Sequence, residues 1–479
     1  MLNHYPSLVA NLKDSGNHKE VTSPYDGSII GTVSAVDEQG VEKAIQTAYA
    51  IYRDRSRWLP APKRIEILEK TVSIMTDRFD ELALEAAREG GKPLTDSILE
   101  VTRAINGINN CIDCIRTETG KMIPMGLNAA SMNKLAFTTK EPIGVVIAVS
   151  AFNHPLNLAV HQIGPALAAG CPFIIKPAGT TPITCLRFVK ILHEAGLPIE
   201  YGQALVTDNN KTATKLVSDE RVGFFSFIGS AAVGWMLKSK LAPGVRCALE
   251  HGGVAPVIVE ADADLDMLAP LLTRGGLYHA GQVCVSVQRV FAHKSIAKDL
   301  ADRLATLGSA MKIGDPTDKA TKIGPLISPL EVDRIDDWVQ QAISDGATLL
   351  CGGKRLDNNC YAATILLNPP TNTKISKNEV FGPVICVYSY DAVDDAIAEA
   401  NSLMFAFQAA VFTKDIDKAF YVYKNIDAAA VMINNHTAFR VDWMPFAGLK
   451  HSGQGIGGIP YTFEEMQVSK LAIFNSPSL

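Results

Sequence analysis

Residues 144–178 read GVVIAVSAFNHPLNLAVHQIGPALAAGCPFIIKPA, and this segment sets the architecture of the chain. Its two ends, GVVIAVS and PFIIKPA, are short apolar runs rich in β-branched residues, as buried strands are. The part between them begins at Pro155 and ends at Gly170, which are a start and a stop signal for a helix. A strand, a helix and a second strand at this spacing predict a parallel sheet covered by helices.

Similar patterns continue on both sides of this segment. Apolar residues three and four positions apart predict helices from Asp37 to about Thr117. Three further strand-like runs follow the segment, namely GQALVTD, FFSFIGS and CALEH. A second alternation of strands and helices extends from about residue 255 to residue 434. The sequence therefore predicts an α/β protein with two sheets.

Two stretches look like strands that belong to neither sheet. They are SMNKLAFTTKE at residues 131–141 and VSKLAIFNS at residues 468–476. They predict an arm that pairs with another subunit by strand addition, or alternatively a simple hairpin and tail.

The composition argues against several classes of partner. The 479 residues are 47% hydrophobic and 20% charged, and they carry a net charge of −5. There is no basic block and no apolar run of about 18 residues, so neither nucleic acid nor a membrane is an expected partner. The N-terminus lacks a basic segment followed by an apolar one, which predicts a cytoplasmic protein.

The nine cysteines are scattered, which indicates reduced thiols rather than a disulfide framework. Cys111 and Cys114 form a C-x-x-C pair in a helical stretch and are expected to be buried structural thiols. No cluster of His, Cys and Asp at ligand spacing stands out, so no metal is expected.

Three side chains suit covalent catalysis, although each also has an ordinary structural explanation. Cys284, in YHAGQVCVSVQRV, can be a nucleophile as the thiolate, whereas an isolated buried cysteine is usually inert. Glu250 ends a strand beside glycines and can act as a general base, or it can be a capping or solvated carboxylate. Asn153 can donate to an oxyanion, or it can cap the helix that follows it.

Two further features suit ribose or phosphate groups at the carboxyl ends of the strands, where such sheets bind ligands. Lys176 ends the strand PFIIKP, where its ammonium can hold ribose hydroxyls or phosphate, or simply be solvated. Gly229 and Ser230, in FIGSAAVG, open a predicted helix whose N–H groups suit a pyrophosphate, although the pattern is not G-x-G-x-x-G.

These separate signals occur together as seven motifs in one order. The motifs are Asn153, Lys176, FIGS at 227–230, EHGG at 250–253, GQVC at 281–284, EVFGP at 379–383 and PFAGLKHSG at 445–453. The series resembles the aldehyde dehydrogenase superfamily, and the resemblance covers nearly the whole chain, from about Val21 to Phe474.

The resemblance implies a reaction. Cys284 would attack an aldehyde to form a thiohemiacetal, whose oxyanion Asn153 and the Cys284 N–H would hold. Hydride would pass to a nicotinamide and leave a thioester, which water activated by Glu250 would hydrolyse to the carboxylic acid. The implied enzyme is an NAD(P)-dependent aldehyde dehydrogenase.

The resemblance also implies the cofactor contacts. Lys176 would bind the adenosine ribose, and Ser230 would contact the pyrophosphate, with Gly229 providing the turn. Glu379 would hold the nicotinamide ribose, and Phe381 would pack against the nicotinamide.

Three positions depart from the family pattern. Gly179 stands where the family usually has a glutamate that binds the ribose 2′-hydroxyl, so NAD is the expected cofactor and NADP is possible. His251 replaces a leucine after the base, where it either packs or tunes Glu250. Ala447 replaces a glycine, and neither change removes a group that the chemistry needs.

For the fold, the resemblance implies a Rossmann-like cofactor domain, an α/β catalytic domain and a β-arm for oligomerisation into a homodimer or homotetramer. The expected boundaries are 1–120 and 141–252 for the cofactor domain, 253–435 for the catalytic domain, 121–140 and 460–479 for the arm, and 436–459 for a return to the cofactor domain.

For the substrate, FNHPLN and FRVDWMPFAG resemble the branch that contains lactaldehyde, phosphonoacetaldehyde and semialdehyde dehydrogenases. In the phosphonoacetaldehyde enzymes, the counterparts of Arg103, His154 and Arg440 bind the anionic end of the substrate. A guanidinium fork suits a phosphonate, sulfonate or carboxylate. A small aldehyde that is hydroxylated or anionic is therefore expected.

Each of these three residues also has a structural explanation. Arg103 can be a solvated charge, Arg440 can pair with Asp442 or another acid, and His154 can be a satisfied interior histidine. Val283 precedes the nucleophile where the phosphonoacetaldehyde enzymes have an arginine, which weakens the case for a phosphonate.

Two alternatives to this function stay open. A CoA-acylating dehydrogenase would pass the acyl group to CoA, but that branch generally lacks the base at Glu250. A non-catalytic binding or structural protein on the same scaffold would not need Asn153, Glu250 and Cys284 together.

Overall fold

The predicted first sheet is present, with six strands in the order β21-β11-β10-β6-β7-β8. The computed structural model describes residues 3–14 and 16–479. Neighbouring strands are parallel except for β21, which runs antiparallel to β11. The strands are β6 (Val145–Val149), β7 (Phe173–Lys176), β8 (Gly202–Ala204), β10 (Val222–Ile228), β11 (Arg246–Glu250) and β21 (Gly453–Gln454).

The strand order reverses between β6 and β10, because the chain runs from β6 outward to β8 and then crosses to the other side of β6. Helices cover both faces: Val146 and Ala148 point into one apolar core, and Val145 and Ile147 point into the other. The helices are α1 (Glu38–Arg53), α2 (Ala61–Asp77), α3 (Phe79–Gly90), α4 (Leu94–Thr117), α5 (Asn157–Ala169), α6 (Pro182–Glu194), α7 (Asn210–Ser218) and α8 (Ala231–Lys238).

The second sheet has seven strands in the order β14-β15-β16-β13-β12-β18-β19, all parallel except β14. Its strands are β12 (Val257–Val259), β13 (Arg289–His293), β14 (Thr348–Cys351), β15 (Thr364–Leu367), β16 (Val384–Tyr390), β18 (Gln408–Phe412) and β19 (Ala430–Ile433). Its helices are α9 (Leu265–Leu277), α10 (Ala297–Ser309), α11 (Pro329–Ser344), α12 (Lys374–Lys377), α13 (Val393–Asn401) and α14 (Ile416–Asn425).

The run GQALVTD is not the single strand that the sequence predicted. It divides at Leu205, where β8 stays in the first sheet and β9 (Val206–Thr207) leaves it to pair with β3 (Ile29–Val36). With β1 (His4–Tyr5) and β2 (His18–Thr22), these strands form a small N-terminal sheet. An apolar run alone does not show which partner each half takes.

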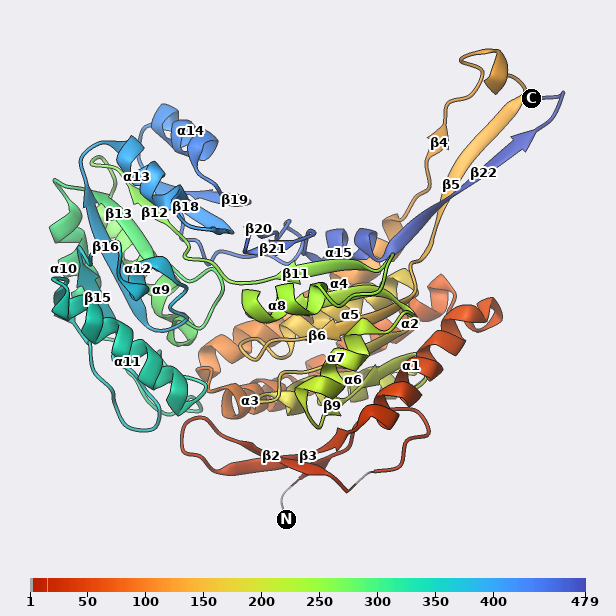
Figure 1. The fold of residues 1–479 in the computed structure, drawn as a ribbon, viewed down its shortest axis with the longest axis horizontal. Helices are drawn as coiled ribbons and strands as arrows, with labels where there is room; N and C mark the ends of the chain where they lie inside the picture. Colours follow the sequence, from red (N-terminus) through yellow and green to blue (C-terminus); the bar gives the residue numbers. More distant parts are fainter. Residues whose placement is uncertain (1–2, 15) are drawn as a thin grey trace.

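Figure 1 shows a long ribbon projecting from the body of the molecule. It is the three-stranded sheet of β4 (Met122–Ile123), β5 (Lys134–Pro142) and β22 (Gln467–Asn475), with β5 and β22 antiparallel along their whole length. We call this sheet the arm. The remaining elements are α15 (Ile459–Glu465), the antiparallel pair β17 (Phe405–Ala406) and β20 (Leu449–Lys450), and the short turns Arg55–Arg57, Ala129–Ser131 and Tyr278–Gly281.

All nine cysteines are free thiols, and Cys111 and Cys114 are buried in α4, as expected. Among the helices of the described residues, none combines the length and the apolar character needed to cross a membrane.

Candidate active site

A cavity of about 800 Å³ lies at the carboxyl ends of β6, β10 and β11, where the strand order of the first sheet reverses. Its other wall is formed by the part of the chain that carries the second sheet, in the segments before β13, before β16 and after β19. Ten of the residues selected from the sequence line it, namely Arg103, Asn153, His154, Gly229, Ser230, Glu250, Cys284, Glu379, Phe381 and Arg440.

Cys284 follows a tight turn in which His279 and Ala280 adopt left-handed backbone conformations, with φ values of 50° and 54°. Such conformations are unfavourable for residues other than glycine and need support from their surroundings. Gln282 provides it, because its amide donates to the Pro325 carbonyl (3.2 Å) and its Oε1 accepts from the Ile327 N–H (2.9 Å). This turn presents Cys284 to the cavity.

The surroundings of Cys284 keep its thiol protonated. Burial raises the pKa of Cys284, the nearby carboxyl groups of Glu379 and Glu250 raise it further, and Arg440 opposes them. Because the thiolate is the nucleophilic form, a base must take the proton as the sulfur reacts.

Asn153 lies beside the nucleophile rather than on a helix end. Its Nδ2 donates to the Gln282 carbonyl (2.9 Å), which leaves one N–H of the amide for another acceptor. The backbone N–H of Cys284 makes no hydrogen bond to another of the described residues. These two N–H groups are suited to hold an oxyanion formed on a carbon bound to the sulfur.

The alternative of Asn153 as a helix cap is wrong. α5 is capped instead by Glu100 of α4, whose Oε1 accepts from the N–H groups of Leu156 (2.9 Å) and Asn157 (3.0 Å). The sequence analysis missed Glu100, which is buried and lies far from α5 in the chain.

Glu250 ends β11 and faces the cavity. Burial raises its pKa to about 7, and the charge of Arg440 opposes this rise. Its carboxyl group lies against the backbone of Gly457, where a Cβ would come within 2.0 Å of Oε1. A carboxyl group with this pKa suits general base catalysis near neutral pH.

The turn before α8 has the form expected for a pyrophosphate site. Gly229 is bound at both backbone groups: its N–H donates to the carbonyl of Glu250, the last residue of β11 (3.1 Å), and its carbonyl accepts from Nδ1 of His251, the next residue (2.9 Å). Ser230 precedes the first turn of α8, and its side chain makes no capping bond. His251 is buried against Phe227 and Trp235, so it supports this turn rather than contacting the Glu250 carboxyl group.

Glu379 carries an unsatisfied buried oxygen. Burial raises its pKa to about 8, and its Oε1 has no hydrogen-bond partner in the described structure. Its carboxyl group lies against Gly252, where any side chain would collide with it. A ribose hydroxyl would supply the missing donor, so this position fits a nicotinamide ribose. Phe381 lies nearby, edge-on to Phe152 at 5.8 Å.

Lys176 is the one predicted cofactor residue that does not line the cavity, although Ala178 beyond it does. Burial and the charge of Lys19 lower the pKa of Lys176, so two ammonium groups lie at this end of the site. Gly179 is exposed, and its Cα faces open space.

Arg103 is neither a solvated charge nor a free anion receptor. It forms two hydrogen bonds with Asp442, from Nε (3.2 Å) and from Nη2 (2.6 Å). Asp442 also contacts His161 Nε2 at 2.7 Å, so its carboxylate is fully engaged. The pairing of Arg440 with Asp442, which the sequence left open, is therefore wrong.

Arg440 keeps its charge available. No carboxylate of the described residues lies within ion-pair distance of it, and its guanidinium stacks 3.9 Å from the centre of the Phe446 ring. Burial lowers its pKa to about 10, so it stays protonated at neutral pH. The guanidinium is half-buried and its Nη1 donates to the Met444 carbonyl (3.4 Å), which leaves its other N–H groups available. A cation without a carboxylate partner in the wall of a cavity suits an anion.

His154 is a satisfied interior histidine. Its Nδ1 lies 2.8 Å from Lys92 Nζ and its Nε2 lies 2.9 Å from the Tyr278 hydroxyl. The sequence analysis missed both partners.

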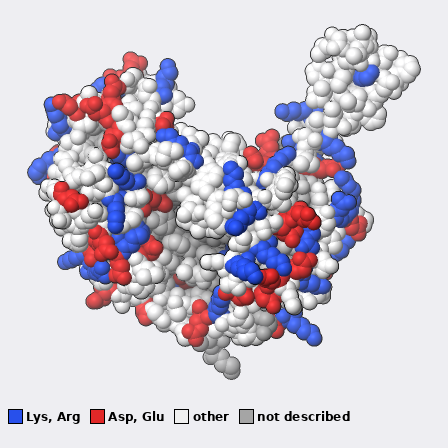
Figure 2. Space-filling view, viewed as in Figure 1, with Lys and Arg blue, Asp and Glu red and all other residues white. Residues whose placement is uncertain are grey.

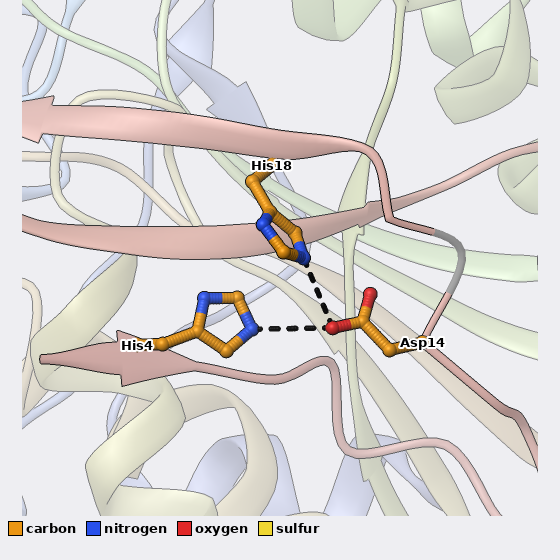
Figure 3. Close-up of side chains that lie close together, drawn as sticks. All are labelled: His4, Asp14 and His18. Carbon is orange, nitrogen blue, oxygen red and sulfur yellow. Dashed lines mark hydrogen bonds and ion pairs between the residues drawn. The ribbon is translucent and has the colours of Figure 1, made fainter.

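A separate cluster lies at the surface of the N-terminal sheet. Figure 3 shows His4 and His18 directed at the same oxygen of Asp14, at 3.4 and 3.0 Å. His18 Nε2 hydrogen-bonds the carboxylate, whereas His4 hydrogen-bonds the hydroxyl groups of Thr32 (2.9 Å) and Ser34 (3.0 Å). The sequence analysis did not expect a His and Asp cluster with ligand atoms this close together.

Comparison with known proteins identifies the family to which this chain belongs. Residues 12–472 match the model of the aldehyde dehydrogenase family, and the chain belongs to this family. A 3-sulfolactaldehyde dehydrogenase from Priestia aryabhattai is 36% identical over 458 residues, which cover 95% of this chain and 94% of that protein.

Solved structures are similar over the whole length. Aldehyde dehydrogenase 21 from Physcomitrella patens, in complex with the reaction product succinate, has a TM-score of 0.96 and 32% identity, with 100% of both chains covered. The glyceraldehyde-3-phosphate dehydrogenase from Methanocaldococcus jannaschii, complexed with NADP, has a TM-score of 0.91 and 33% identity, covering 97% of this chain and 100% of that one.

Proposed function

We propose that this protein oxidises a small hydroxylated or anionic aldehyde to the carboxylic acid, with NAD(P)+ as the oxidant. The observation that carries the proposal is the meeting of Cys284, Asn153 and Glu250 in one cavity, although they lie in three distant parts of the chain. The relatives support it, because their names concern sulfolactaldehyde, succinate and glyceraldehyde 3-phosphate. Formation of reduced cofactor from a panel of such aldehydes tests it.

In the first half of the reaction, the Cys284 sulfur attacks the aldehyde carbon as Glu250 takes the thiol proton. Asn153 and the Cys284 N–H stabilise the resulting oxyanion, since each has an N–H without a partner among the described residues. Bound NAD(P)+ supplies the acceptor for the hydride that leaves this carbon. The residues that would hold it are Ser230 and Glu379, with their neighbours at the cavity wall.

In the second half, Glu250 first passes the thiol proton to solvent and then takes a proton from water as the water oxygen attacks the thioester carbon. The C–S bond breaks, the acid leaves, and Glu250 returns its proton to the Cys284 sulfur. The presence of this carboxyl group in the cavity favours hydrolysis over transfer to CoA. Acyl-CoA formed in the presence of CoA would favour that alternative instead.

The adenosine end of the site supports NADP as well as NAD. Lys176 and Lys19 bring two positive charges there, and Gly179 leaves open space where the family usually has a carboxylate. Lys19 uses two N–H groups on the carbonyls of Thr207 (2.9 Å) and Asp208 (2.8 Å), so it is held in place with one donor left.

Lys19→Met is expected to lower kcat/KM for NADP about tenfold, because a lost charge-assisted bond to phosphate costs on this order. The value for NAD should change less than about twofold. Steady-state kinetics with both cofactors measure this, and Lys354→Met, an exposed lysine of the second unit, is the matched control. Equal losses for both cofactors would contradict the role.

Arg440→Met is expected to lower kcat/KM for succinate semialdehyde about 100-fold, since a buried anion would lose its only cationic partner. Butanal, which lacks the carboxylate, should be affected far less. Because Arg440 also lowers the pKa of Glu250, the rising limb of the pH–rate profile should move to higher pH. Equal losses of kcat/KM with both aldehydes would contradict the role of Arg440 in binding the substrate anion.

We further propose that the arm pairs with another subunit. Leu471, Ile473 and Phe474 of β22 are each at least half exposed, and Figure 2 shows few charged side chains at the outer end. Exposed apolar strands of this kind are usually covered by a partner. Light scattering measures the mass of the assembly.

The domain boundaries predicted from the sequence are also part of this proposal. Residues 1–120, 141–252 and 436–459 would form the cofactor domain, and residues 253–435 the catalytic domain. The pairing of β21 with β11 supports this assignment of the late segment, although β20 of the same segment pairs with β17 of the second unit.

A further inference from the structure

Tyr278 brings a hydroxyl group to the wall of the cavity beside the nucleophile. Its ring packs in the same small apolar cluster as Val283 and Cys284. The two groups are close enough for a charge on Cys284 to raise the pKa of the phenol. Nothing in the reaction proposed above uses this hydroxyl.

A buried chain of hydrogen bonds ends at the Tyr278 hydroxyl. Glu100 pairs with the ammonium of Lys92, which contacts His154 Nδ1 (2.8 Å), and His154 Nε2 contacts Tyr278 (2.9 Å). The side chains of Lys92 and Glu100 are 1% and 0% exposed, so water does not compete for these bonds. The other oxygen of Glu100 holds the start of α5, which anchors the chain to the fold.

The donor at each step of this chain can be assigned. An ammonium group only donates, so Lys92 donates to Nδ1 of His154. Burial and the charge of Lys92 lower the pKa of His154, so the ring is neutral and carries a single proton. That proton is therefore on Nε2, from which it is donated to the Tyr278 oxygen.

The O–H of Tyr278 is consequently free to donate into the cavity. Burial raises the pKa of Tyr278, so the phenol keeps this proton at neutral pH. On the basis of the proposed function, we infer that Tyr278 hydrogen-bonds the hydroxyl oxygen on the carbon next to the aldehyde, and that His154 and Lys92 are positioning residues that aim it.

The surroundings favour a hydroxyl group over an anion as the partner of Tyr278. Arg440 already supplies a charged receptor, whereas Tyr278 offers a neutral donor among the apolar side chains of Val283, Val285 and Phe446. A substrate hydroxyl buried there without a partner would be costly, so a pocket with such a donor selects for 2-hydroxyaldehydes. His154 thus acts through Tyr278 rather than by contacting the substrate.

The test compares 2-hydroxypropanal with propanal, which differ only in the hydroxyl group. Tyr278→Phe is expected to lower kcat/KM for 2-hydroxypropanal about tenfold and to leave the value for propanal within about twofold. The hydroxyl also binds the aldehyde before reaction, so KM for 2-hydroxypropanal should rise with little change in kcat.

His154→Leu should also lower kcat/KM for 2-hydroxypropanal relative to kcat/KM for propanal, because the Tyr278 oxygen loses its hydrogen-bond donor. His154→Gln should restore part of it, since its amide can accept from Lys92 and donate to Tyr278. If His154→Leu does not fold, Tyr278→Phe and His154→Gln still test whether Tyr278 binds the substrate hydroxyl group. Equal losses for both aldehydes, or no loss, in Tyr278→Phe would overturn the inference. Failure of the wild-type protein to oxidise either aldehyde would instead count against the proposed function.

Discussion

Replacing Cys284 with alanine is expected to lower kcat about 10⁴-fold or more, because no covalent intermediate can form without the sulfur. Binding of NAD(P)+ should persist, since the thiol lies outside the turn and the carboxyl groups expected to hold the cofactor. Absorbance of the reduced cofactor measures turnover, and fluorescence titration measures binding.

Cys351→Ala is the matched control for this variant. Cys284 and Cys351 are the two half-buried thiols of the chain, and the other seven are buried. Cys351 lies in β14, outside the cavity, so its loss should leave turnover unchanged. Turnover that survives in Cys284→Ala would show that the nucleophile lies elsewhere.

Glu250→Gln is expected to slow thioester hydrolysis by about 10²- to 10⁴-fold, the usual contribution of a general base. Formation of the thioester should be less affected, so a burst of reduced cofactor should precede a slow steady state. Rapid-mixing absorbance resolves the two phases. Equal losses in burst and steady state would contradict a role in hydrolysis.

The pH dependence of thioester hydrolysis provides a second test of the role of Glu250. Because the pKa of Glu250 is raised to about 7, its carboxyl group is mostly protonated below this pH and cannot accept a proton. The rate of hydrolysis should rise about tenfold per pH unit up to about pH 7 and then become constant. Glu250→Gln should lose this rising limb.

The sequence predicted the first sheet well because its signals are local. β6 and β7 each appear as a short apolar run. The helix between them was predicted to begin at Pro155 and begins at Asn157, and it ends at Ala169, just before Gly170, as predicted. The early strands β1, β2 and β3 were missed. β1 and β2 are short and contain polar residues, and the pairing of all three depends on partners elsewhere in the chain.

The candidate site was predicted only as far as individual motifs allow. Arg103 and Arg440 look alike in the sequence, but Asp442 binds the first and leaves the second without a carboxylate partner among the described residues. Nothing in the sequence near Arg103 reveals a partner 339 residues away. Lys92 and Tyr278 were missed for the same reason. Their roles depend on hydrogen bonds to the His154 ring, which lies between them in the structure.

The pairing of β5 with β22 also bears on how the arm forms during synthesis. β22 begins 325 positions after β5 ends, so β5 is made long before its partner strand. Until then, β5 presents an unpaired edge on a nascent polypeptide, where it is open to wrong pairing. Loss of β22 would make this transient condition permanent, and chains without it should aggregate even though the nucleophile and its cavity are intact.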